Sequence, residues 1–230
     1  MRKALAVLST VILLAVSIFG INAHSKTKGV VRNVREVKTN LVIDAGHGGI
    51  DAGCIGVDGS LEKIINFDIA CNLYDFARVC GLNAFMIRDG DYLFYKSGDD
   101  TSKSDLYNRM DFIESIYNST LISIHQNHFE NEAERGMQVW YSPNGDKSAK
   151  LADNILRYTK KNLQPDNERL NKMSDDSYYL LHKASVPSVM VECGFMSNRE
   201  ECSLLNSSDY QKKIAYSILS GFCSYICEEL

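Results

Sequence analysis

Short apolar segments alternate along this chain with segments whose apolar residues recur every three to four positions. The short segments, rich in strand-forming residues, cover residues 41–45, 83–88, 120–125, 137–142 and 186–192. The helical spacing covers residues 61–80, 104–117, 147–162 and 208–229. Because strands that alternate with helices favour parallel pairing, we predict a single α/β domain with a mostly parallel central sheet and helices on both faces.

The composition is that of a folded domain with a sizeable core. Of the 230 residues, 45% are hydrophobic and 23% are charged, which excludes a disordered chain. The net charge of −4 argues against nucleic acid as a partner. The seven cysteines include no CxxC pair, so neither a zinc ribbon nor a thioredoxin-type site is indicated, and their odd number leaves at least one thiol unpaired within the chain.

The N-terminus predicts export. Residues 1–23 begin with Arg2 and Lys3 and continue as an uncharged apolar run, as a signal peptide does. The run is close to the shortest length that spans a bilayer, so an uncleaved membrane anchor is the alternative. We interpret residues 24–39 as a linker and residues 40–230 as the catalytic domain. The protein is therefore expected outside the cytoplasmic membrane, either released or anchored to it.

Four polar residues stand where an α/β sheet places its active site. His47, His125 and Glu192 follow or end predicted strands, and Glu62 lies at the start of the first predicted helix. Taken singly, His47 is also explained as a turn cap, His125 as a core histidine and Glu62 as a first-turn acid. A carboxylate that ends a buried strand, however, is costly unless it is paired or functional. Two imidazoles and one carboxylate form a catalytic zinc site, and a second carboxylate moves the proton.

Four motifs carry a resemblance to a known family. IDAGHGGIDAG, LEKIINFDIA, SIHQNH and VPSVMVECGFMSN resemble, in order, the signatures of zinc-dependent N-acetylmuramoyl-L-alanine amidases of the amidase-3 type. The resemblance runs from Leu41 to the C-terminus. It implies that His47, Glu62 and His125 bind one Zn²⁺ per chain and that Glu192 is catalytic. The reaction it implies is cleavage of the amide bond between N-acetylmuramic acid and L-alanine in peptidoglycan.

The overall form is similar to spore-cortex members of that family. Both consist of a catalytic domain behind an N-terminal signal or anchor. This resemblance implies a role in forming muramic-δ-lactam, which germination requires, at the forespore or cortex. A chain of charge −4 gains no electrostatic attraction to an anionic wall. We therefore expect a localising or regulatory partner protein, or retention by the membrane anchor.

His128 departs from the family pattern, which has a small residue at that position. If the strand continues beyond His125, alternation directs His128 to the opposite face. We therefore expect His128 to support the site or line the substrate groove and not to bind metal. Asn127, in the same motif, is also expected to support the site or to contact the substrate.

Other polar residues are predicted to support the site or to contact the substrate. Asn66, one helical turn after Glu62, is placed to orient that carboxylate, whereas the neighbouring Ile64 replaces an acidic residue common in the family. In the long polar loop 163–177, Arg169 and Lys172 are candidates to meet the carboxylates of a peptide stem. Arg109 is expected to make structural hydrogen bonds from a helix face turned away from the core.

Three other functions stay open at this point. A zinc peptidase that cuts within the peptide stem uses the same ligand set. A wall-associated interaction protein with a vestigial site is less consistent with an intact Glu192. A cysteine hydrolase would use Cys193, but strand alternation places that thiol on the face opposite to Glu192.

Overall fold

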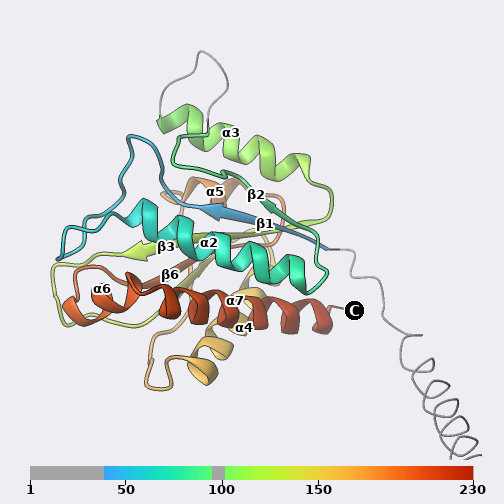
Figure 1. Ribbon diagram of the computed structural model, residues 1–230. Helices are drawn as coiled ribbons and strands as arrows, with labels where there is room; N and C mark the ends of the chain where they lie inside the picture. The colour runs from blue at the N-terminus through green and yellow to red at the C-terminus, as the bar shows by residue number, and fades with distance from the viewer. Residues whose placement is uncertain (1–38, 95–101, 230) are drawn as a thin grey trace, which may run out of the picture. The chain divides into compact units, whose positions relative to one another are not determined.

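The computed structural model describes residues 39–94 and 102–229 (Figure 1). Its six-stranded sheet has the order β2-β1-β3-β6-β4-β5. The strands are β1 (Asn40–Ala45), β2 (Ala84–Met86), β3 (Ser119–Asn127), β4 (Gln138–Tyr141), β5 (Lys172–Met173) and β6 (Ser188–Phe195). Strands β2, β1, β3 and β6 pair in parallel, whereas β4 runs antiparallel to β6. The prediction of a mostly parallel sheet is confirmed.

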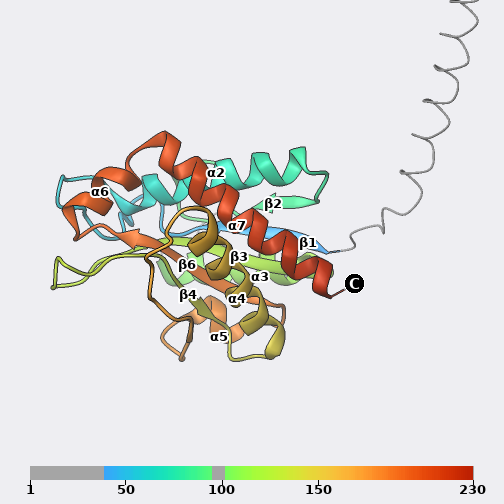
Figure 2. The same ribbon diagram turned by 90° about the horizontal axis from the view of Figure 1, so that it is seen from below.

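Helices cover both faces of this sheet, as predicted. They are α2 (Glu62–Val79), α3 (Ser102–Ser115), α4 (Asp146–Asn162), α5 (Tyr179–Lys183), α6 (Arg199–Leu205) and α7 (Ser208–Glu228). Helix α7 packs against both α2 and α4 on one face, and α3 packs against α5 on the other (Figures 1 and 2). No helix within the described ranges is long and apolar enough to cross a membrane. The predicted signal or anchor and nearly all of the predicted linker lie outside those ranges.

The core is built on the two central strands. Leu41, Val42 and Ile43 of β1 are fully buried, as are Leu121 and Ile122 of β3. Such near-continuous apolar runs are typical of parallel strands covered on both faces. The burial of each of these aliphatic side chains stabilises the folded state by roughly 1.5–3 kcal/mol. This core therefore supports the strand ends that carry the polar residues.

Three short elements were not predicted: β5, α5 and α6. They contain two, five and seven residues, too few for a periodic pattern to show. Strand β5 lies inside the loop predicted for residues 163–177. Strand β6 continues three residues beyond Glu192, so Cys193 lies within the strand.

The strand order determines where a site can form. Strand β1 has β2 on one side and β3 on the other, so the chain reverses its winding direction between β1 and β3. Ligand sites of open α/β sheets lie at such a switch point, beyond the carboxyl ends of the strands. His47 follows β1 and His125 lies near the end of β3 at this point.

Candidate metal centre and active site

His47 lies in the tight loop after β1, in a left-handed backbone conformation with φ of 63°. Its Nδ1 lies 2.8 Å from Oδ2 of Asp51, and its Nε2 lies 3.3 Å from Oε2 of Glu62. The loop also needs Gly46, because a Cβ atom there would overlap the imidazole ring of His125. The close approach brings the two histidine rings to a centroid distance of 5.0 Å.

Glu62 is the first residue of α2 and is 3% exposed. Its Oε1 accepts a hydrogen bond from the Gln126 amide at 3.0 Å and lies 3.1 Å from Nδ1 of His125, while its Oε2 accepts one from the Cys54 amide at 2.9 Å. Burial alone would raise the pKa of Glu62, but His125 and His47 hold that pKa well below its usual range. The carboxylate is therefore ionised at neutral pH.

The protonation of His47 is linked to its two acidic neighbours. Burial would lower the pKa of His47, but hydrogen bonds and charge attraction from Glu62 and Asp51 raise that pKa to about 9. Metal ligation requires the unprotonated ring nitrogen, so a metal ion that binds here releases a proton.

His47, Glu62 and His125 form a group that can hold a metal ion. One ligand atom from each residue lies within 4.8 Å of the others. Asn66 contacts this group: its Nδ2 donates to Oε1 of Glu62 at 3.2 Å, and its Oδ1 accepts from Nε2 of Gln126 at 3.1 Å. Two imidazoles and one ionised carboxylate with supporting hydrogen bonds fit a divalent metal such as zinc.

Glu192 lies beside this group on the neighbouring strand. It pairs in register with His125 across β3 and β6 and is 9% exposed. Its buried Oε2 has no hydrogen-bond partner among the described residues. Burial raises the pKa of Glu192 to about 7, with a further contribution from the charge of Glu62. A carboxyl group that titrates near neutral pH is suited to general acid–base chemistry.

A buried arginine fixes the backbone of His47. Arg109 is 1% exposed, so its expected position on an outward helix face is wrong, although its expected structural role is confirmed. Its guanidinium bonds Asp44 at 2.6 Å, Asp105 at 2.8 Å and the carbonyl oxygen of His47 at 2.8 Å. Ser123 donates to the other oxygen of Asp44 at 2.6 Å. This cluster ties β1 and β3 to α3 directly beneath the metal-capable group.

Sequence reasoning did not identify Asp51 and Gln126. Asp51 follows His47 by four residues, and an acid near a candidate histidine ligand is a usable signal, because ligating histidines commonly donate to a carboxylate. Gln126 gave no such signal. Its contribution comes from its backbone amide and from its contact with Asn66, which depend on the packing of α2 against β3.

Asn127 and His128 do not belong to the metal-capable group. Strand β3 ends at Asn127, whose carbonyl oxygen accepts the Met196 amide at 2.8 Å, and His128 is exposed beyond the strand. Cys193 is fully buried, and burial raises the pKa of its thiol well above the usual range. A buried neutral thiol is a poor nucleophile, so the structure speaks against the cysteine-hydrolase alternative.

The two candidate substrate cations differ in their surroundings. Arg169 forms an ion pair with Glu134, and its guanidinium lies 4.3 Å from the ring centroid of Phe195. Lys172 is exposed on β5, with its Nζ 5.1 Å from the ring centroid of Trp140. Arg169 therefore holds two loops together, whereas Lys172 has its charge available.

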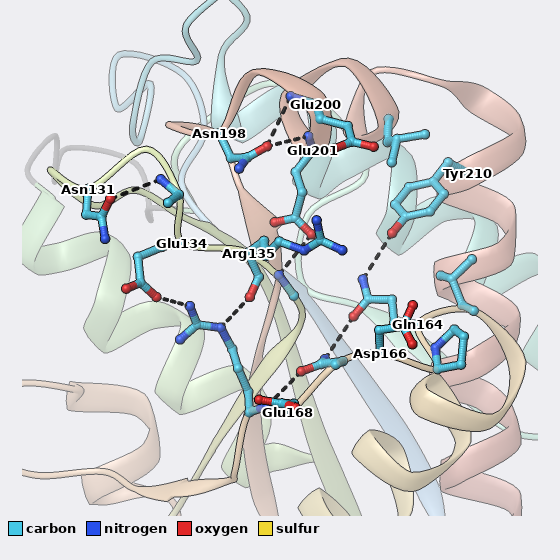
Figure 3. A pocket seen from close by; sticks show the side chains of 17 residues that line it. Asn131, Glu134, Arg135, Gln164, Asp166, Glu168, Asn198, Glu200, Glu201 and Tyr210 are labelled. Atoms are coloured by element: carbon cyan, nitrogen blue, oxygen red, sulfur yellow. Dashed lines mark hydrogen bonds and ion pairs between the residues drawn. The ribbon is translucent and has the colours of Figure 1, made fainter.

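A pocket of about 670 Å³ lies apart from these catalytic candidates (Figure 3). Its walls come from segments 131–136, 163–169 and 198–204 and from Tyr210 of α7. Figure 3 shows Gln164 directed at Tyr210, with a hydrogen bond of 3.0 Å, and other lining groups also bond one another. None of the metal-capable residues lines this pocket, so it is not the candidate active site.

The fold and these side chains define an enzyme of the α/β class whose site can hold a metal ion at the carboxyl edge of the sheet. The chain belongs to the N-acetylmuramoyl-L-alanine amidase family, whose profile matches residues 41–224. It is accordingly a hydrolase that acts as an N-acetylmuramoyl-L-alanine amidase on peptidoglycan.

Named relatives agree with this family. The chain is 28% identical over 193 residues to the germination-specific N-acetylmuramoyl-L-alanine amidase of Bacillus subtilis, covering 82% of this chain and 80% of that protein. It is 36% identical to the CwlD amidase of Clostridioides difficile, solved in complex with the GerS lipoprotein, with a TM-score of 0.78 over 83% of this chain and 99% of that one. The amidase AmiC2 of Nostoc punctiforme is 30% identical, with a TM-score of 0.72 over 84% of this chain and 98% of that one.

Proposed function

We propose that this chain is a zinc-dependent amidase in which His47, Glu62 and His125 hold one zinc ion. The closeness of their ligand atoms, within 4.8 Å of one another, supports this assignment. When bound, zinc supplies Lewis-acid chemistry, because it polarises a carbonyl oxygen and lowers the pKa of water to about 7. The contact of Asp51 with Nδ1 of His47 leaves Nε2 free to act as the ligand nitrogen.

The observation that carries the mechanism is the unpartnered, buried carboxyl of Glu192 beside the His–Glu–His group. We assign Glu192 as the general base that takes a proton from the attacking water. The same carboxyl then returns the proton to the departing amine of L-alanine. A carboxyl whose pKa is raised to about 7 can hold that proton between the two steps.

Product analysis tests this function directly. We expect the full chain with zinc to digest peptidoglycan to glycan with a free lactyl carboxylate and to peptides that begin with the amine of L-alanine. Chelation should abolish both products, and added zinc should restore them. New amine ends inside the stem, found by mass spectrometry, would instead identify a zinc peptidase.

We further propose a role in spore-cortex modification and germination. The germination-specific name of the B. subtilis relative supports this role. The resemblance to spore-cortex amidases supports it too, because their peptide-removing reaction is the step before muramic-δ-lactam formation. Spores that lack this chain should then lack muramic-δ-lactam. Complementation with the parent sequence should restore the lactam, and complementation with Glu192→Gln should not. Normal lactam content in the deletion strain would exclude the role.

An exported location and a partner protein complete the proposal. Cell-wall substrate requires action outside the cytoplasmic membrane, with residues 1–23 as signal or anchor. The lipoprotein in the CwlD complex suggests a partner of the same kind, which would localise the enzyme and order the loops around the site. The mass of the exported chain distinguishes a cleaved signal from a retained anchor, and affinity capture from sporulating cells tests for a lipoprotein partner.

A further inference from the structure

The face that carries Glu192 continues across the sheet as a row of paired residues. Gln138 of β4 lies opposite Glu192, and the next pair on the same face is Trp140 with Met190. Lys172 of β5 pairs in turn with Trp140. Residues two apart on a strand share a face. Trp140 and Lys172 therefore lie on the face of Glu192, one row or about 7 Å along the strands from it. Trp140 is also one strand across and Lys172 two strands across, at about 4.8 Å per strand.

Trp140 is fixed between two neighbours. The ring of Tyr178 lies at a centroid distance of 4.9 Å, tilted by 31°, and Nζ of Lys172 lies 5.1 Å from the indole centroid. Burial raises the pKa of Tyr178, and the charge of Glu192 contributes to this shift. The phenol therefore stays protonated at neutral pH and can donate a hydrogen bond near Glu192.

Lys172 is a cation without an anionic partner within the described ranges. It is exposed, and its ammonium takes part in no ion pair or hydrogen bond there; its contact is the face of Trp140. Arg169, three residues earlier, pairs instead with Glu134. Of the two candidate substrate cations, Lys172 is thus the one whose charge is free for a ligand.

Buried polar atoms without hydrogen-bond partners among the described residues also lie in β4, next to β5 and in α5. They are Nε1 of Trp140, Oγ of Ser174 and Nδ1 of His182, none of which has a hydrogen-bond partner among the described residues. Ser174, next to β5, is only 5% exposed. The great majority of buried polar groups in native proteins pair with protein or with ordered water. We therefore expect water or a polar ligand to supply the missing hydrogen bonds in this region.

We propose that Trp140, Lys172 and Tyr178 form a subsite for the peptide stem, in which Lys172 binds the free carboxylate of the residue that follows L-alanine. The inference rests on the proposed function, because Glu192 sets the position of the scissile amide. Lys172 lies one row along and two strands across from Glu192, roughly 12 Å between their backbones. Two extended peptide residues span about 7 Å of this distance, and the long side chain of Lys172 has to cover the rest. The subsite makes the enzyme selective for an acidic stem over one whose carboxylate is amidated.

The single tryptophan of the chain makes this testable by binding alone, because Trp140 is the only source of tryptophan fluorescence. The full chain is titrated with a soluble stem peptide that begins with L-alanine, in its acidic and amidated forms. We expect the acidic form to bind about fivefold more tightly, as for an exposed ion pair. Lys172→Met should bind both forms equally, and Lys172→Arg should keep the preference.

Lys161→Met is the matched control, because Lys161 on α4 also lies over an aromatic ring, 5.7 Å from Tyr158. This variant should behave as the parent chain does. Equal affinity of the parent for both peptides, a preference that survives in Lys172→Met, or no saturable binding would overturn the subsite. These peptides are products that need no cleavage, so a failure of the proposed amidase chemistry would appear separately, as uncut peptidoglycan in the digestion assay.

Discussion

Glu62 and Glu192 both neighbour His125, yet their surroundings move their pKa values in opposite directions. Glu62 accepts two backbone amide hydrogen bonds and faces two histidines, so its charged form is favoured. Glu192 is buried with an unpartnered oxygen, so its protonated form is favoured. Acid–base pairs in enzymes are commonly separated by environment in this way. The contrast supports assigning metal binding to Glu62 and proton transfer to Glu192.

The two histidines near the end of β3 give a test at the scale of single residues. We expect His125→Ala to lose its zinc, because it removes one of three ligands, and His128→Ala to keep about one zinc per chain. His128 is exposed beyond the strand and lies outside the metal-capable group. Zinc content of the purified variants provides the measurement. Equal loss in both would show that the ligand set is wrong.

The buried cluster that joins β1, β3 and α3 gives a test of stability at the scale of elements. Asp44→Asn should lower the free energy of unfolding at pH 7 by roughly 3 kcal/mol, because it leaves Arg109 buried beside an uncharged group. Asp91→Asn is the control. Its ion pair with Lys63 is half exposed on the carboxylate side, so the loss should stay below about 1 kcal/mol.

The stability loss expected for Asp44→Asn depends on pH in a defined way. Burial would raise the pKa of Asp44, but Arg109 and Ser123 hold it below its usual value. A carboxyl whose pKa is lowered in the folded state contributes stability above its unfolded pKa of about 3.9 and loses it as pH falls through the folded pKa. Urea unfolding should show a constant difference between parent and Asp44→Asn from pH 5 to 8. The difference should shrink below pH 4, and a difference that grows there would refute the assignment.

The contact between α4 and α7 depends on one glycine. A Cβ atom on Gly221 would lie 2.5 Å from Cα of Ile155, so the two helix backbones must move apart to accept it. We expect Gly221→Ala to destabilise the fold by roughly 1–3 kcal/mol despite the better helix propensity of alanine. Ser220→Ala, one residue earlier and half-buried, should stay within about 0.5 kcal/mol in the same urea titration. A Gly221→Ala chain as stable as the parent would contradict this packing.

Sequence patterns predicted the long elements and the residues at strand ends because these depend on local periodicity. His47 follows β1, and His125 and Glu192 lie in the carboxyl-terminal halves of β3 and β6, whatever the strand order is. The antiparallel direction of β4 was not predictable, because it depends on where the segment after His128 returns to the sheet. The inward position of Arg109 likewise follows from a partner 65 residues away, Asp44, and not from the apolar spacing of its own helix.

At the scale of the whole molecule, net charge determines how the protein meets its insoluble substrate. A chain of charge −4 is repelled by an anionic wall, and salt screens that repulsion. We expect the full chain alone to sediment weakly with purified peptidoglycan, and the bound fraction to stay level or rise as salt is added. Tight binding that salt disrupts would contradict this view and would remove the need for a localising partner.

The most direct test of the account compares the two site carboxylates as amides, Glu62→Gln and Glu192→Gln, by zinc content and amidase turnover. We expect Glu62→Gln to lose zinc. Glu192→Gln should keep about one zinc per chain and lose roughly 10²- to 10⁴-fold in turnover, the usual contribution of a general acid–base group. The reverse result, with zinc lost from Glu192→Gln and kept by Glu62→Gln, would contradict the proposed division of roles.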